Sequence, residues 1–227
     1  TGGIGTGELT SASGKDYATG RRLMTDEVNA VVAAIFASGP AEILVDDSHG
    51  DMQNLLHTEL DPRVTYIQGA VKPFGMVEGL DESFDAAIFI GYHARAGTPR
   101  GFLAHTGSGA VKGLWINGVE AGEGEMNAAY AGSVGVPVIL ASGDSAFVAQ
   151  FRQNVPSATV VTKTAVTPAS ARLRHPHHVR GDLPAATRAA IASLEGAEPW
   201  RIGTPVHVRM RFADVTAPTK VQLVVST

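Results

Sequence analysis

Three residues between positions 93 and 123 are of types that bind metal ions. His93 follows the apolar run from Ala86 to Ile90, His105 ends a second short apolar run, and Glu123 opens a predicted helix. An apolar run that ends in a polar residue is typical of a buried strand, and ligands bind at the carboxyl edge of an α/β sheet. Two imidazoles and a carboxylate brought together there suit zinc. The alternative is that the histidines are hydrogen-bonded structural residues, which is the commoner role at a strand end.

A second predicted strand also ends in a histidine. Residues 42–45 are predicted to form a short buried strand that leads into a polar segment containing Asp46, Asp47 and His49. Strands that alternate with helices form a parallel sheet, so both strand ends open onto one crevice. We therefore expect His49 and His93 to lie along that crevice. Asp46 and Asp47 could hold the tautomer of a ligand histidine, or could equally cap the following turn.

The remaining histidine-rich and glycine-rich segments are less informative. His57 is expected on the surface or at the boundary of a short helix. Residues 174–178 read Arg-His-Pro-His-His, which indicates a solvated turn more simply than a second metal site. The glycines of residues 1–7 match neither the dinucleotide nor the P-loop spacing.

Composition limits the function classes. The 227-residue chain has no cysteine, which removes thiolate catalysis, disulfides and cysteine-type zinc sites and leaves histidine and carboxylate as metal ligands. A net charge of −4 and a pI near 6.0 argue against a nucleic-acid or anionic-membrane surface. No apolar run approaches the length of a membrane span, and no signal-peptide pattern opens the chain. A cytoplasmic location is the default expectation.

The hydrophobic periodicity predicts an α/β fold, with a largely parallel sheet covered by helices on both faces in residues 1–163. Residues 164–227 are predicted to form a smaller C-terminal α+β subdomain, helical up to residue 195 and followed by strands at 205–212 and 221–225. Two further details are specific enough to test. Thr25 is expected to cap a helix that ends at Gly39, and a short helix is expected near residues 52–56.

The motifs along the chain resemble, in order and spacing, those of the bacterial D-aminopeptidase family of the dipeptide-transport operon. Members of that family are dinuclear zinc peptidases, and the resemblance covers about residues 17–195. The residues that carry it are Arg22 to Asn29, Val45 to Gly50, Asn54-Leu55, Lys72-Pro73, Met76 to Asp81, Gly91 to Ala96, His105-Thr106, Ile116-Asn117, Gly122-Glu123, Asn127-Ala128 and Val136 to Val138.

The resemblance implies roles for four residues. His49, His93 and Glu123 correspond to zinc ligands of the family, with two zinc ions expected per subunit, and His105 corresponds to its catalytic histidine. The family's other two ligands form an Asp-x-Glu pair at the end of a first strand. We expect that pair to precede Thr1, and the alternative is that the first residues form a rearranged loop.

The function implied by the resemblance is a zinc-dependent aminopeptidase that hydrolyses short peptides with N-terminal D-amino acids by attack of a metal-activated hydroxide. A homo-oligomer is implied as well, a decameric ring in the family. The preference for D residues comes from the resemblance alone. The alternatives are a metal- or ligand-binding homologue without peptidase activity, lacking part of the zinc site, and a plain α/β scaffold with structural histidines.

Overall fold

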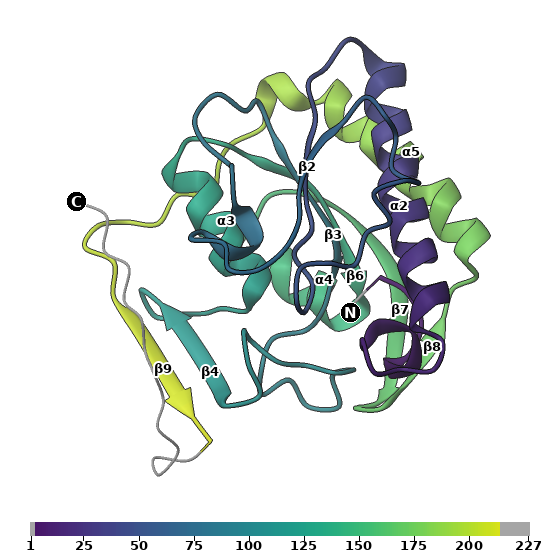
Figure 1. The fold of residues 1–227 in the computed structure, drawn as a ribbon. Helices are drawn as coiled ribbons and strands as arrows, with labels where there is room; N and C mark the ends of the chain where they lie inside the picture. The colour runs from purple at the N-terminus through teal and green to yellow at the C-terminus, as the bar shows by residue number, and fades with distance from the viewer. Residues whose placement is uncertain (1–2, 214–227) are drawn as a thin grey trace.

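A computed structural model describes residues 3–213 of the chain. Its central sheet has the strand order β3-β6-β7-β8, in which the first three strands run parallel and β8 runs antiparallel to β7 (Figure 1). These strands span Ala87–Tyr92 (β3), Val138–Asp144 (β6), Ala158–Thr167 (β7) and Ser170–Leu173 (β8). All seven residues of β6 are buried, as expected for a central strand covered on both faces. The mixed α/β class predicted from the sequence is confirmed.

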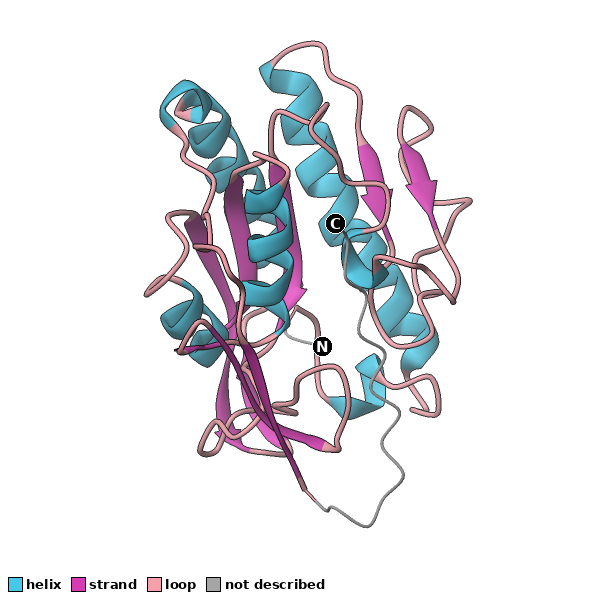
Figure 2. Cartoon of the chain, turned by 90° about the vertical axis from the view of Figure 1, so that its left-hand side faces the viewer, coloured by secondary structure: helices cyan, strands magenta, loops and turns pink. Residues whose placement is uncertain are grey.

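Helices cover the two faces of this sheet (Figures 1 and 2). Neighbouring residues of β6 point to opposite faces, so Val138 packs with one group of helices and Ile139 with the other. One face holds α3 (Glu123–Ser133) and α4 (Ser145–Phe151), and the other holds α2 (Tyr17–Ser38) and α5 (Pro176–Ala192). None of the helices in residues 3–213 combines the length and apolarity needed to cross a bilayer.

Two small sheets lie outside the central one. Strands β1 and β2 pair in parallel, while β4 lies between β5 and β9 in an antiparallel sheet. The β4–β5 hairpin turns at Asn117-Gly118, whose φ values of 47° and 84° are of the kind that this turn requires. The bounds are Leu44–Asp46 (β1), Thr65–Ile67 (β2), Val111–Ile116 (β4), Val119–Glu120 (β5) and Val208–Phe212 (β9). The short helices are α1 (Gly7–Thr10), η1 (Gly75–Val77) and η2 (Leu194–Gly196).

Two predictions about local structure near the N-terminus were wrong. Helix α2 begins at Tyr17 rather than at Thr25, whose hydroxyl donates to the carbonyl of Arg21 inside the helix instead of capping its start. Residues 52–56 form an irregular segment rather than a helix. The Asp47 carboxylate accepts the backbone N–H groups of Asn54 and Leu55, and this holds the segment in a non-helical conformation.

The segment after residue 163 also differs from the prediction. Strand β7 continues to Thr167 and returns as β8, so the expected helix begins only at Pro176, which follows an N-cap formed by His175. Residues 174–178 therefore start a helix instead of interrupting one. The predicted strand at 221–225 lies outside the described residues. The division into two domains at residue 163 stays a prediction; this residue lies within β7.

A buried aspartate ties the central sheet to the segment that follows β3. One oxygen of Asp144, which is fully buried, accepts the N–H groups of Ala146 and Phe147 and caps α4. The other oxygen accepts the N–H of Ala94, at 2.9 Å. Asp144 thus fixes the position of the residue next to His93.

We expect Asp144→Ala to lower the free energy of unfolding by about 2–4 kcal/mol, because it removes a helix cap and leaves the buried N–H of Ala94 unpaired. Urea unfolding measures this change. Asp26→Ala is the control, since Asp26 pairs with Arg180 at the surface and its loss should cost less than about 1 kcal/mol. A loss at Asp144 no larger than that of the control would contradict the anchoring role.

Candidate metal centre

His93 lies immediately beyond the carboxyl end of β3, at the edge of the sheet where the sequence placed it. Its side chain is buried, with 7% of the residue exposed. The Nδ1–H group donates to the carbonyl of Ala94 at 3.1 Å, which leaves Nε2 as the nitrogen that can bind a metal ion. Nε2 points toward the Glu123 carboxylate, 3.1 Å from Oε2.

Glu123 is the first residue of helix α3, where a carboxylate is stabilised by the positive end of the helix dipole. Its second oxygen, Oε1, accepts the backbone N–H of Gly107 at 2.8 Å. The contacts with His93 and Gly107 hold the carboxylate between the end of β3 and the loop that contains His105.

His105 comes from that loop and completes the group. Its Nδ1–H donates to the carbonyl of Leu103 at 2.7 Å, and its ring stacks on the ring of His93 with the centroids 4.0 Å apart. Nε2 lies 3.6 Å from Oε1 of Glu123. One ligand atom from each of His93, His105 and Glu123 can therefore be chosen so that all lie within 4.8 Å of one another.

This donor set fits a divalent metal ion such as zinc. Each imidazole gives its Nδ1–H to a backbone carbonyl, so the neutral tautomer with a free Nε2 is favoured. Both Nε2 atoms and a carboxylate converge, and nitrogen and oxygen are the ligands that zinc accepts in a protein without cysteine.

The electrostatics of the group favour an ionised carboxylate on Glu123 and a neutral ring on His105. Burial alone would raise the pKa of Glu123, but the hydrogen bond with His93 and the N–H of Gly107 outweigh it and lower that pKa to about 2. Burial also lowers the pKa of His105 from its ordinary value. A ligand must be deprotonated to bind metal, and both shifts favour the deprotonated form.

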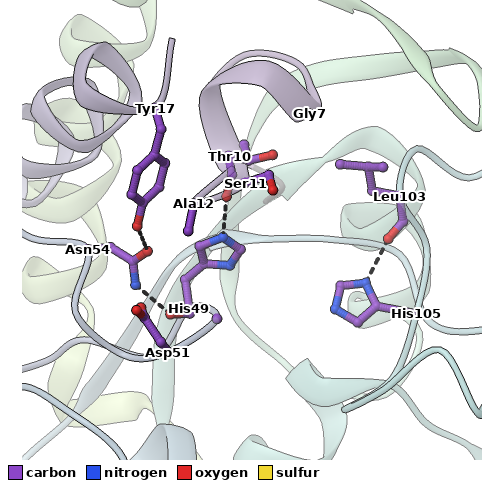
Figure 3. Close-up of a pocket in the computed structure, with 11 residues that line it drawn as sticks. Gly7, Thr10, Ser11, Ala12, Tyr17, His49, Asp51, Asn54, Leu103 and His105 are labelled. Carbon is purple, nitrogen blue, oxygen red and sulfur yellow. Dashed lines mark hydrogen bonds between the residues drawn. The ribbon is translucent and has the colours of Figure 1, made fainter. Parts of the chain in front are cut away.

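His49 lies apart from this group. It follows β1, and its Nε2–H donates to the carbonyl of Thr10 at 2.6 Å. His49 and His105 line the same pocket of about 390 Å³ and lie on two sides of it (Figure 3). The structure thus brings together His93, His105 and Glu123, and places His49 across the pocket with its Nδ1 available.

Asp46 and Asp47 hold the backbone of the His49 loop instead of an imidazole. Asp46 pairs with Lys72 and accepts the N–H of Glu78. Asp47 is buried and accepts the side-chain amide of Asn54 in addition to two backbone N–H groups, and the same Asn54 amide donates to the carbonyl of His49. Of the two roles that the sequence allowed, the structure supports control of the local turn.

The other histidines lie away from the metal cluster. His57 is exposed, and His175 caps α5 by accepting the N–H of His177 with its ring nitrogen. The sequence did not single out Thr10 and Leu103, the residues whose carbonyls orient His49 and His105. A backbone carbonyl leaves no signature in residue type, although Leu103 is marked in the structure by a φ of 47°.

Comparisons with known proteins agree on one family. The family model of peptidase family M55, described as D-aminopeptidase, matches residues 1–227. A D-aminopeptidase of Bacillus subtilis (strain 168) is 45% identical over 148 residues, which are 65% of this chain and 54% of that protein; the chain thus spans about half the length of this curated relative. A solved structure, the Zn-dependent D-aminopeptidase DppA from Bacillus subtilis, described as a self-compartmentalizing protease, matches with a TM-score of 0.90 at 34% identity. The match covers 94% of this chain and 78% of that chain.

The buried state of His49 predicts acid sensitivity of the metal-free protein. Burial lowers the pKa of His49 from 6.5 to about 4. Between these pH values the unfolded chain binds a proton at His49 that the folded chain does not, so the stability present above about pH 6.5 is lost as the pH falls toward 4. We expect the free energy of unfolding of His49→Gln to fall less than that of the wild type between about pH 7 and about pH 5.

Urea unfolding of the metal-free protein at the two pH values gives this comparison. His57→Gln, at an exposed position, is the matched control and should keep the acid dependence of the wild type. Equal acid dependence in all three proteins would show that His49 is not buried in its neutral form.

Proposed function

The chain belongs to the D-aminopeptidase family, peptidase family M55, and from that premise we propose that it is a zinc-dependent aminopeptidase that removes N-terminal D-amino acids from short peptides. The observation that carries the proposal is the convergence of His93, His105 and Glu123 with both Nδ1 atoms held by backbone carbonyls. The D-aminopeptidase of Bacillus subtilis and the zinc-dependent structure to which the chain is similar support the substrate and the metal.

We propose that His49, His93 and Glu123 are zinc ligands and that each subunit binds two zinc ions. His93 and Glu123 present converging ligand atoms, and His49 presents Nδ1 from across the pocket. Zinc bound in this way would polarise the peptide carbonyl and lower the pKa of a bound water.

In this proposal His105 transfers protons. Its Nδ1–H is held by the Leu103 carbonyl, so Nε2 is the atom that can accept a proton from the attacking water and return it to the leaving amine. The lowered pKa of His105 keeps the ring neutral, the form that accepts a proton at neutral pH. The pocket between His49 and His105 is where the N-terminal residue of the peptide would lie.

We further propose that the chain forms a homo-oligomer, with a decameric ring as the specific arrangement. Support comes from the similar structure, which is described as self-compartmentalizing, and from the exposed apolar side chains of Val206, Val208 and Met210 in and before β9. A subunit contact is one role for such a surface. The cytoplasmic location stays a prediction.

Replacing His93 or His105 should have different effects. His93→Ala removes a ligand, so zinc content and hydrolysis should fall together, and the melting temperature should drop because metal binding no longer stabilises the fold. His105→Ala should retain zinc but lose roughly 10²–10⁴-fold in kcat, the usual contribution of a positioned acid–base group. KM should change less, because the group acts mainly on the transition state.

Zinc content by plasma mass spectrometry and hydrolysis of a D-alanine anilide test both variants, with His57→Ala as the control at an exposed histidine. Loss of zinc in His105→Ala would make this residue a ligand rather than a proton carrier. Full activity in His105→Ala would assign the proton transfer to another group. A wild-type protein that binds zinc but hydrolyses no D-amino-acid peptide would favour the non-catalytic metal-binding alternative.

The proposed assembly predicts a molar mass in solution several times the 23.6 kDa of one chain, and about ten times that mass for the ring. Multi-angle light scattering at micromolar protein concentration measures it directly. A mass equal to that of one chain would contradict the proposed homo-oligomer.

A further inference from the structure

Lys163 is an unusual residue in the core. It lies on β7 and only 1% of it is exposed, although lysine is among the residue types least often buried. A buried ammonium group costs free energy unless its donors are satisfied, so its contacts identify what it stabilises.

The first contact is with the N-terminal segment. Nζ of Lys163 donates to the carbonyls of Ile4 and Gly5, at 2.8 and 2.7 Å. This segment shows as the purple end of the chain beside the green strand β7 in Figure 1. The carbonyls come from a short, glycine-rich stretch with few side chains of its own to anchor it, and a cation is a strong partner for them.

The second contact is with the loop that contains His105. Nζ lies 4.4 Å from the centroid of the Phe102 ring, a distance at which the face of an aromatic ring attracts a cation. Phe102 is fully buried. The same ammonium group therefore touches two segments that are almost 100 residues apart in the sequence.

The surroundings keep Lys163 charged. Burial lowers its pKa to about 8, and the carboxylates of Asp144 and Glu27 oppose this shift. The amine is therefore predominantly protonated at neutral pH, and its charge is partly balanced by Asp144 and by Glu27, whose own pKa is raised by burial to about 7.

Each contacted segment leads directly to a histidine of the pocket. The N-terminal segment continues into α1, whose Thr10 carbonyl accepts Nε2–H of His49. Phe102 precedes Leu103, whose carbonyl accepts Nδ1–H of His105. Figure 3 shows these two carbonyl–imidazole pairs on the two sides of the pocket.

We propose that Lys163 is a positioning residue that clamps both walls of the pocket, so that one ammonium group fixes the orientation of His49 and His105 together. The clamp acts through the backbone, because Lys163 holds the segments whose carbonyls hold the imidazoles. Its effect on hydrolysis rests on the proposed aminopeptidase function, whereas its effect on the two imidazoles does not.

The test compares two variants on the same strand. Lys163→Met keeps a long side chain but removes the ammonium group, and Val160→Ala is the control. Val160 is buried against the α5 side of the sheet, so its truncation weakens the core without touching the clamp. Diethyl pyrocarbonate modifies accessible unprotonated imidazoles, and peptide mass spectrometry gives a rate for each histidine of the metal-free protein. Exposed His57 is the internal reference.

In Lys163→Met the modification rates of His49 and His105 should both rise several-fold, while the rate of His57 stays constant. In Val160→Ala all three rates should stay near those of the wild type. A rise at only one pocket histidine, at neither, or equally in Val160→Ala would overturn the clamp.

Two further variants keep the test decisive where Lys163→Met does not fold. The double variant Lys163→Met, Glu27→Gln also removes the carboxylate of Glu27, which would otherwise be left without its cation. It should show the same rise in the modification rates of His49 and His105. Phe102→Leu removes the aromatic face that Lys163 contacts beside the His105 loop, and it should raise the modification rate of His105. Unchanged modification rates of His49 and His105 in the double variant, or of His105 in Phe102→Leu, would contradict the proposal.

With the zinc-loaded enzyme, kcat/KM of Lys163→Met per bound zinc should fall about 10–100-fold, the scale expected for a displacement of catalytic groups by about 1 Å. If the modification rates change but kcat/KM does not, the inference that Lys163 supports hydrolysis by orienting the two histidines is overturned. If the wild type hydrolyses no peptide, the proposed function fails, and the modification rates still decide the clamp.

Discussion

Hydrogen bonds from imidazole N–H groups to backbone carbonyls are the interactions on which the candidate site depends. His93 donates to Ala94, His105 to Leu103 and His49 to Thr10. Each bond selects one tautomer and turns the other ring nitrogen toward the pocket or the cluster. Because the acceptors are backbone atoms, the site is only as well ordered as the loops that carry them.

Buried charged side chains hold those loops. Asp144 anchors the N–H of Ala94, Asp47 anchors the turn after His49, and Lys163 contacts both the N-terminal segment and Phe102. Burying a charge costs free energy, and a buried charge stabilises the fold only when its hydrogen bonds are satisfied. In this protein each lies next to a segment that orients a site residue, which links the polar core to the geometry of the metal cluster.

The proposed roles of the site residues match how deeply each side chain is buried. His93 and Glu123 are buried and constrained by the end of β3 and the start of α3, which suits ligands that must keep their positions. His105 is more exposed and faces the pocket, which suits a group that exchanges protons with substrate and water. The neutral state of His105, favoured by burial, is the state that accepts a proton.

The sequence by itself determined the α/β class and the strands that lead to His49 and His93, and it singled out His93, His105 and Glu123, which the structure brings together. These depend on hydrophobic periodicity and residue type, which are local properties. The sequence mispredicted the start of α2 and the hairpin of β7 and β8, because side-chain contacts and strand pairing overrode local propensity. Only the tertiary structure decided that His105 stacks on His93 and that Lys163 spans two distant segments, since both contacts depend on how loops with no periodic pattern pack together.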